Sequence, residues 1–175
     1  YLMIVEGYEY GYDYGSTTLT VESIDAISPT ADVDLGSELG CDPATGDTST
    51  YTEVWTPGCA SSSATDYVID WIAPADGCYT FTTNGSSYDT AVAVLQSGGF
   101  CGDTEIDCDD DGGEGLRSAG EATLTAGESV KIVITGYSTS TGEFTFGITD
   151  CEAFSDDTCM GTELGDTGGP VVDPL

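Results

Sequence analysis

The sequence predicts an all-β protein, and three observations lead to this prediction. Signals for helices are almost absent from its 175 residues. Short runs rich in Thr, Val, Tyr and Ile alternate with Gly, Asp and Pro, which is typical of strands and turns. The runs also follow one another too closely to leave room for helices. Together these features indicate an antiparallel β-sandwich or jelly roll.

The first element is an extended N-terminal strand segment, residues 1–29, ending near Pro29. Its even positions form one apolar and aromatic face, interrupted by Glu6, whereas the odd positions after Val5 are glycine or acidic. A second strand is expected at 16–24. The face comprises Leu2, Ile4, Tyr8, Tyr10, Tyr12 and Tyr14.

The central region, residues 30–150, supplies the predicted sandwich. Strands are expected at 67–74, 78–83, 89–96, 121–126, 129–137 and 142–149. Asp76-Gly77 and Asn84-Gly85 are typical turn pairs. The continuously apolar run at 89–96 is expected in a sandwich interior. Residues 151–175 form a loop-rich C-terminal tail with room for one short strand.

The charge balance excludes several classes of partner. The chain has 32 acidic residues against two basic ones, Arg117 and Lys131, and a formal net charge of −30. Nucleic acids and anionic membrane surfaces need positive charge, so neither is expected as a partner. Divalent cations or a salty exterior would compensate this charge. No apolar run approaches the roughly 18 residues of a membrane span.

Seven cysteines favour an oxidising compartment. None has the CxxC spacing, and the chain has no histidine, which excludes a mixed Cys/His zinc site. Disulfides are therefore the first interpretation and buried thiols the alternative. The chain starts at Tyr1 rather than methionine, so we expect that a signal sequence has been removed and that the protein is extracellular or at the cell surface.

The order and spacing of several stretches carry a family resemblance. They are "DLGSELG" (34–40), "DYVIDWIAPADGCYTFTTNGSSYDTAVAVLQ" (66–96), "CGDTEIDCDDDGG" (101–113), "LTAGESVKIVITGY" (124–137) and "TGEFTFGIT" (141–149). Across residues 33–149 the chain resembles a bacterial pre-peptidase C-terminal (PPC) domain. The resemblance implies a β-sandwich of jelly-roll type in a secreted protein, often appended to proteases and not catalytic. It also implies that calcium binding, adhesion to substrate or a role in secretion occurs in some members.

The resemblance does not account for the tyrosine-rich segment or for the extreme charge, and no protease domain is present. In the tail, "ELGDTGG" (163–169) is similar to "DLGSELG" (34–40). The tail therefore either contains a strand like the one that opens the sandwich or matches it by chance in a glycine-rich chain.

The densest acidic cluster lies at 105–114 and predicts a calcium site. Calcium takes six to eight oxygen ligands, and an acidic loop closed by glycines can supply several. The spacing is not that of an EF-hand. By resemblance, the loop around Asp89 packs near this cluster. The expected ligands are Asp89, Asp107, Asp109, Asp110 and Asp111. The alternative is a solvated acidic turn.

Three disulfides are expected. A hairpin-like connection could bring Cys101 and Cys108 close enough to bond, and the resemblance supports this pair. A second bond, Cys151–Cys159, would close a short loop. The third preference is Cys59–Cys78, which leaves Cys41 as the odd thiol, although pairing cannot be settled from sequence.

Two further side chains have competing interpretations. Asn84 begins the sequon "NGS" and is a glycosylation candidate, but Asn-Gly is equally a hairpin turn. Lys131 lies in a strand and is expected at the surface rather than as a nucleophile. Catalysis has little support, because without histidine no Ser-His or Cys-His pair exists. Among so many acids no carboxylate pair stands out, and no phosphate-binding glycine motif is present.

Three functional hypotheses follow. In the first, the chain is a secreted structural subunit that polymerises into a filament, with residues 1–15 donated as a strand to the next subunit. In the second, it is a calcium-dependent adhesion or substrate-targeting module associated with a secreted enzyme, with a carbohydrate or cell-surface partner. In the third, residues 1–29 simply add strands to their own sandwich.

Overall fold

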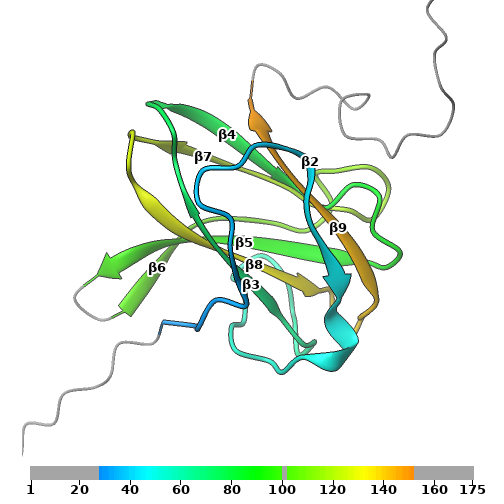
Figure 1. Ribbon diagram of the computed structural model, residues 1–175. Helices are drawn as coiled ribbons and strands as arrows, with labels where there is room; N and C mark the ends of the chain where they lie inside the picture. The colour runs from blue at the N-terminus through cyan, green and yellow to red at the C-terminus, as the bar shows by residue number, and fades with distance from the viewer. Residues whose placement is uncertain (1–27, 100–101, 152–175) are drawn as a thin grey trace, which may run out of the picture.

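The computed structural model describes residues 28–99 and 102–151, which form a β-sandwich (Figure 1). One sheet, called sheet A, has the strand order β1-β3-β8-β5-β6; the other, sheet B, has the order β2-β9-β4-β7. The strands are β1 (Val33–Asp34), β2 (Gly40–Asp47), β3 (Tyr67–Ile72), β4 (Gly77–Thr82), β5 (Thr90–Gly99), β6 (Gly102–Asp109), β7 (Ala119–Leu124), β8 (Ser129–Gly136) and β9 (Glu143–Asp150), with one 3-10 turn, η1 (Thr48–Thr50), after β2.

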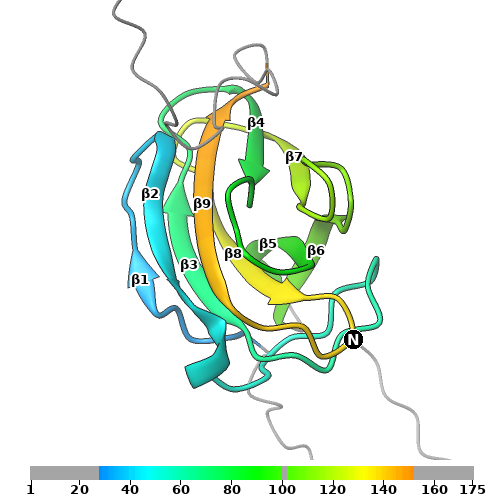
Figure 2. The ribbon, with the colours of Figure 1, turned by 90° about the vertical axis from the view of Figure 1, so that its right-hand side faces the viewer.

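The strand order is that of a jelly roll. From β2 to β9 each connection crosses to the other sheet, except the β5–β6 connection, which stays in sheet A. All pairs among these eight strands are antiparallel. Figure 2 shows the two sheets edge-on, with β2 and β9 in front of β3 and β8. The predicted antiparallel sandwich of jelly-roll type is confirmed.

The main core lies between the sheets and is aromatic at its centre. Trp71 from β3 packs against Tyr79 and Phe81 from β4, with ring centroids 4.9 and 5.7 Å apart. All three side chains are fully buried. The alternation of these residues with polar ones is what pins the register of each strand.

A second, smaller core explains why the run at 91–95 is apolar at every position. Val92 and Val94 face the main core, whereas Ala93 and Leu95 belong to a cluster on the outer side of sheet A. Trp55, from the long connection between η1 and β3, packs on that outer cluster. Because both faces of β5 are covered between Ala91 and Leu95, this part of the strand has no solvent face and is apolar throughout.

Six strands were predicted and all six are present, but β1, β2 and β6 were missed. Strand β2 contains Pro43 and a register shift between Gly40 and Ala44, features that demote a run to an edge strand. Strand β6 alternates acids with other residues and resembles a loop in composition. The alternation reflects the carboxylates of Asp107 and Asp109, which accept hydrogen bonds from strand β7 of sheet B.

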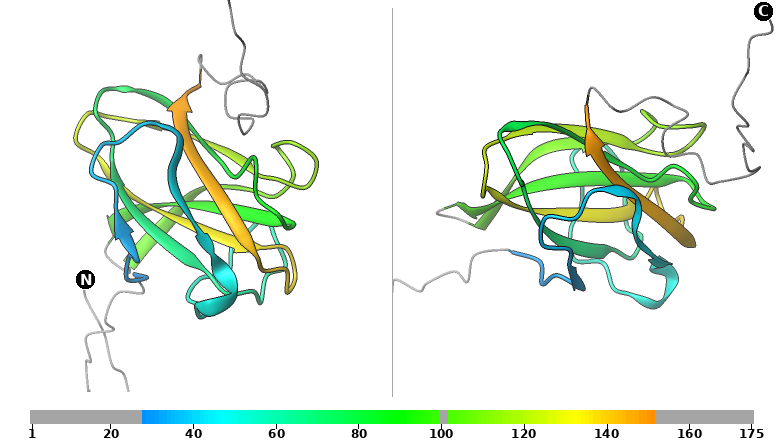
Figure 3. Two further views of the ribbon diagram at one scale, coloured as in Figure 1. Left: turned by 45° about the vertical axis from the view of Figure 1, so that its right-hand side comes forward. Right: turned by 45° about the horizontal axis from the view of Figure 1, so that its top comes forward.

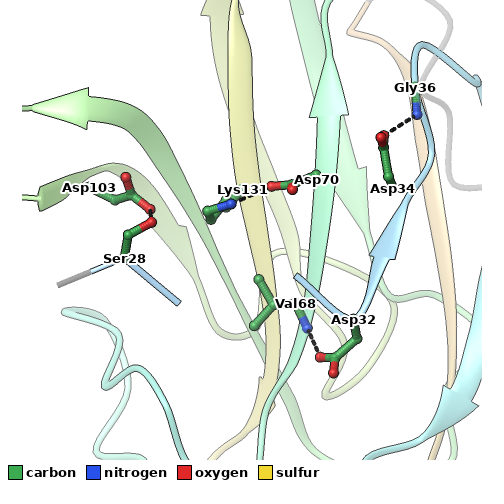
Figure 4. A network of polar contacts seen from close by, with 8 residues as sticks. All are labelled: Ser28, Asp32, Asp34, Gly36, Val68, Asp70, Asp103 and Lys131. Atoms are coloured by element: carbon green, nitrogen blue, oxygen red, sulfur yellow. Dashed lines mark hydrogen bonds and ion pairs between the residues drawn. The ribbon is translucent and has the colours of Figure 1, made fainter. Parts of the chain in front are cut away.

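The edge of β3 is covered by residues 32–36, which precede β2 in the sequence. The Asp32 backbone N–H donates to the Val68 carbonyl (2.8 Å), and the Asp32 carboxylate accepts from the Val68 N–H (2.9 Å). Two residues of β1 then pair in parallel with β3, and the Ile72 N–H donates to the Gly36 carbonyl (2.7 Å). Figure 4 shows this contact beside the ion pair of Lys131 on β8 with Asp70 on β3.

The predicted donor face, Leu2, Ile4 and the four tyrosines at 8–14, lies outside the described residues, as do Cys101 and Cys159. Ser28, the first described residue, donates its hydroxyl to the Asp103 carboxylate at the start of β6 (2.6 Å; Figure 4). Within the described part of the chain no helix is long and apolar enough to cross a membrane.

Candidate metal site and disulfides

Two loops at one end of the sandwich are joined by a dense set of hydrogen bonds. They are the β4–β5 loop (83–89) and the β6–β7 loop (110–118), which lie together at the right of Figure 3, left. The Thr83 N–H donates to the Ser118 carbonyl (3.0 Å), and the Thr90 N–H donates to the Leu116 carbonyl (3.1 Å). These bonds fix the acidic loop against the loop that carries Asp89.

Asp89, Asp110 and Asp111 converge at this junction, and we call them the acidic triad. One carboxylate oxygen from each lies within 4.8 Å of the others. Asp89 and Asp110 are half-buried and Asp111 is exposed. Three negative charges at this separation repel one another in the absence of a cation.

Asp110 is the least satisfied member of the triad. Its Oδ1 atom is buried and has no hydrogen-bond partner. Burial raises the pKa of its carboxyl above the ordinary value, and the charges of Asp111, Asp89 and Asp109 raise it further. A buried carboxylate oxygen without a donor is costly unless a proton or a cation reaches it.

The donor set fits a calcium ion. Carboxylates are hard oxygen ligands, and three of them offer up to six oxygen atoms, within the range that calcium takes. The unpartnered Oδ1 of Asp110 supplies an oxygen that no protein donor occupies. When bound, calcium would neutralise the repulsion within the triad.

Asp107 and Asp109, the other two expected ligands, accept hydrogen bonds from backbone N–H groups. The Asp107 Oδ2 accepts a hydrogen bond from the Glu121 N–H of β7 (2.7 Å). The Asp109 Oδ2 accepts from the N–H groups of Ala119 (2.8 Å) and Gly112 (2.8 Å). Both carboxylates belong to β6, at the edge of sheet A, and both accept a hydrogen bond from β7, at the edge of sheet B. Each is thus already engaged by protein donors, unlike Asp110.

Asn84, a buried residue of the β4–β5 loop, is hydrogen-bonded to the β6–β7 loop. It is only 2% exposed, and its Oδ1 accepts from the Glu114 N–H (2.7 Å). Its Nδ2, the atom that would carry a glycan, is buried. The structure therefore argues against the glycosylation hypothesis and favours the turn interpretation.

Gly113 permits this close approach between the loops. A Cβ atom there would lie 2.7 Å from the Asn84 Oδ1 and 2.7 Å from the Arg117 carbonyl oxygen. Arg117 adds a second tie, because its Nε donates to the Ser86 carbonyl. The sequence analysis assigned no role to Arg117, although its being the only arginine in so acidic a chain was a usable signal.

The disulfides differ from all three predicted pairs. Cys108 bonds to Cys59, with Cα atoms 5.6 Å apart, and not to Cys101. This bond fastens the η1–β3 connection to β6, where Glu105 also accepts from the Trp55 indole N–H (3.1 Å) and the Gly58 N–H (3.0 Å). The predicted short loop is instead occupied by strand β6, Gly102–Asp109.

The second bond joins Cys78 and Cys151, with Cα atoms 5.4 Å apart. Strands β4 and β9 are antiparallel, with Tyr79 opposite Asp150, so the flanking cysteines face each other. The pairs Cys59–Cys78 and Cys151–Cys159 are therefore wrong. Cys41 is also disulfide-bonded, which corrects the expectation that it is the odd thiol. Because Cys78 and Cys151 are bonded to each other, their proximity to Glu121 does not make a metal site.

A further buried acid, Asp66, was not identified from the sequence. It is 2% exposed, and its Oδ2 accepts from the N–H groups of Val54 (2.6 Å) and Trp55 (2.8 Å). Burial raises the pKa of its carboxyl, against the hydrogen bonds from the Val54 and Trp55 N–H groups that lower it. Asp66 thus holds the η1–β3 connection on sheet A.

Comparison with known proteins gives one structural likeness to report. No family model and no curated protein matches the chain. A solved structure that does match is a pre-peptidase C-terminal domain. It is the domain of a collagenase from Bacillus anthracis, with 8% sequence identity and a TM-score of 0.46 over 69% of this chain and 98% of that chain. It belongs to the family that the sequence motifs resemble, while the jelly-roll assignment rests on the strand order itself.

Proposed function

We propose that this protein is a secreted, non-catalytic binding module whose acidic triad binds calcium. The observation that carries the proposal is the convergence of Asp89, Asp110 and Asp111 within 4.8 Å, with the buried Asp110 Oδ1 lacking a partner. Protein donors already engage Asp107 and Asp109. The acidic stretch thus divides into carboxylates that hold the fold and carboxylates that are available to a cation.

Secretion is supported by the cysteine chemistry. The Cys59–Cys108 and Cys78–Cys151 disulfides link cysteines that are separated in the sequence by 49 and 73 positions. Such bonds persist in oxidising compartments. A non-catalytic role is supported by a chain without histidine, in which the converging acids fit a cation site better than a pair of acid–base catalysts.

The binding role rests on the resemblance of the sequence motifs to PPC domains. We propose that the module attaches a secreted enzyme to its substrate or to a cell surface, with an insoluble polysaccharide or protein polymer as the partner class. Calcium would lock the 83–89 and 110–118 loops together and so preorganise the surface that they form.

Titration of the protein with calcium, followed by calorimetry, tests the metal site. We expect saturable binding of one ion, lost in Asp111→Asn. The matched control is Asp42→Asn, which removes the same charge from an exposed position on β2. Equal binding by both variants, or none by the wild type, would overturn the metal proposal. Co-sedimentation with cellulose, chitin and collagen, with and without calcium, tests the binding role.

Self-assembly into a filament by strand exchange is the second hypothesis, and the described sheet edges offer it less support. The edge of β3 is covered by residues 32–36, and β2 carries Pro43. Strand β6 has a register shift at Ile106 and four acids, which would repel an acidic donor strand. Asp107 and Asp109 engage the edge of β7.

Electron microscopy separates the two hypotheses. The module hypothesis expects monodisperse particles with and without calcium. Filaments that disappear when residues 1–15 are deleted would instead establish strand exchange.

A further inference from the structure

One aromatic side chain in the described part of the chain is exposed, and it belongs to the end of the sandwich that carries the acidic triad. Tyr137 directly follows β8 and is 43% exposed, whereas every other described aromatic side chain is buried or half-buried. A tyrosine has an apolar ring and a polar tip, which suits a binding surface in contact with water. Its place beside the triad is what gives this exposed ring a functional meaning.

The backbone around Tyr137 is fixed by the turn that follows β8. The Tyr137 carbonyl accepts a hydrogen bond from the Ser140 N–H (3.0 Å), and the Ser138 carbonyl accepts one from the Ser63 N–H (2.7 Å). Ser138 has a φ of 60°, in the left-handed region that residues other than glycine rarely adopt. A Cβ atom at Gly136 would collide with the Ser140 carbonyl oxygen. A ligand therefore meets the ring on a backbone that is already ordered, which lowers the cost of binding.

The strand register puts Tyr137 beside Asp89. Thr90 is opposite Gly136 in the β5–β8 pair, and one step further along the Tyr137 N–H donates to the Asp89 carbonyl (3.1 Å). Residues directly opposite each other on antiparallel strands have Cβ atoms about 5 Å apart on the same face. The side chains of Tyr137 and Asp89 therefore start from adjacent points, and Asp89 is the member of the acidic triad that the β4–β5 loop supplies.

A second exposed apolar residue, Leu116, lies on the other side of Asp89. The Thr90 N–H belongs to the same peptide unit as the Asp89 carbonyl, and it donates to the Leu116 carbonyl (3.1 Å). The N–H and C=O of one trans peptide point in opposite directions, so the backbones of Leu116 and Tyr137 flank Asp89. At the usual strand spacing they are roughly 10 Å apart. Leu116 is 51% exposed, so Asp89 has an exposed apolar residue on each side.

This combination fits a neutral polysaccharide better than a protein. A stable protein interface buries about 800 Å² on each partner, of which two apolar side chains supply only a small part. A sugar ring has an apolar C–H face and a rim of hydroxyls, which match a tyrosine ring beside polar groups. Calcium takes neutral oxygen ligands as well as carboxylates, and Asp111 is exposed, so the triad is open to solvent. The net charge of −30 opposes an acidic polysaccharide.

We infer that Tyr137, Leu116 and the acidic triad form the binding surface for a neutral polysaccharide chain. One sugar ring packs its C–H face on the Tyr137 ring, and its hydroxyls lie toward Asp89. Leu116 contacts the chain on the far side of Asp89. The inference rests on the proposed calcium-dependent function, and it adds the class of ligand and the residues that contact it.

Co-sedimentation of the full chain with cellulose and with chitin, in saturating calcium, tests this surface. We expect the wild type to bind at least one of the two, and Tyr137→Ala to bind about tenfold more weakly, as for the loss of an aromatic anchor. Tyr137→Phe keeps the ring and should bind like the wild type. The matched control is Ile72→Ala, which removes a 40% exposed apolar side chain from β3 and should leave binding unchanged.

Calcium calorimetry on the same proteins separates this inference from the metal proposal, because Tyr137→Ala should bind calcium as the wild type does. Equal polysaccharide binding by the two proteins, with calcium bound by both, would overturn the inference and leave the metal site standing. Binding of the wild type to collagen but to neither polysaccharide would overturn it in favour of a protein partner. A wild type that binds no calcium would overturn the metal proposal, and the loss of polysaccharide binding in Tyr137→Ala would still decide the role of the ring.

Discussion

Two groups of carboxylates, adjacent in one acidic stretch, have opposite environments. Asp107 and Asp109 accept three backbone hydrogen bonds between them, two of them from strand β7. Asp110 and Asp111, immediately after, converge with Asp89 and meet no such donors at the Asp110 Oδ1. Acidic residues in a row therefore have separable roles, and what separates them is the supply of N–H donors rather than their charge.

The largest effect should follow from removing the first group. In the double variant Asp107→Ala and Asp109→Ala, three backbone N–H groups lose their acceptors. We expect the free energy of unfolding to fall by about 3–4 kcal/mol, at roughly 1 kcal/mol or more for each donor left unsatisfied. Urea denaturation with a chelator present measures this.

The corresponding double asparagine variant is the control, because each side chain keeps one acceptor oxygen. It should lose clearly less stability than the alanine variant. Equal losses would mean that charge, and not hydrogen bonding, is what these two residues contribute.

The second group should respond to calcium instead. A ligand that binds only the folded state at a hundred times its dissociation constant stabilises that state by about 2.7 kcal/mol. We expect this gain in the wild type, and none in Asp110→Asn or Asp111→Asn. Melting curves with calcium and with a chelator measure it. A full calcium gain in both variants would place the ion elsewhere.

A smaller effect of opposite sign is expected without calcium. Asp110→Asn removes a charge whose burial and like-charged neighbours raise its pKa, so the folded state should gain stability. The gain should be below about 1 kcal/mol, as for partly exposed charges. Asp107→Asn, measured in parallel in chelator, should not gain. Loss of stability in Asp110→Asn would show that the carboxylate has donors of its own.

This division shows which part of the candidate site could be predicted from the sequence. The acidic cluster and its neighbour Asp89 were identifiable from residue type and from the family resemblance. Which acids meet N–H donors depends on β6 lying beside β7, a contact between the edges of two sheets. No local pattern contains that contact.

The same limit explains the strands and disulfides. The run at 67–72 and the run at 90–96 were predictable because apolar residues dominate them. Strand β6 was missed because its alternating acids have a protein surface on one side that the sequence does not reveal. The Cys78–Cys151 bond depends on the β4–β9 register across 73 positions of sequence, whereas spacing favours nearer pairs.

The smallest expected effect concerns pH and separates Asp66 from both groups. Burial raises the folded-state pKa of Asp66 above its unfolded value, as it does for Asp110. The folded state therefore binds a proton at each of these carboxyls more tightly than the unfolded state does. Protonation of these carboxyls contributes its whole stabilisation below the unfolded-state pKa, and this stabilisation is lost as pH rises through the folded-state pKa. Exposed Asp47 and Glu128 have pKa values lowered by donors from Ser49 and Thr125, so they act in the opposite direction.

We expect the melting temperature in chelator to rise as pH is lowered from 7 towards 5, because the buried acids begin to bind protons in the folded state before the unfolded chain does. Asp66→Asn should flatten this rise while keeping an oxygen for the Val54 and Trp55 N–H groups. Asp103→Asn changes a half-buried acid whose hydrogen bond with Ser28 is exposed, and it should leave the slope unchanged. A slope that is the same in all three proteins would assign the acid response to the net charge of the whole chain, and not to the buried carboxyl that holds the η1–β3 connection.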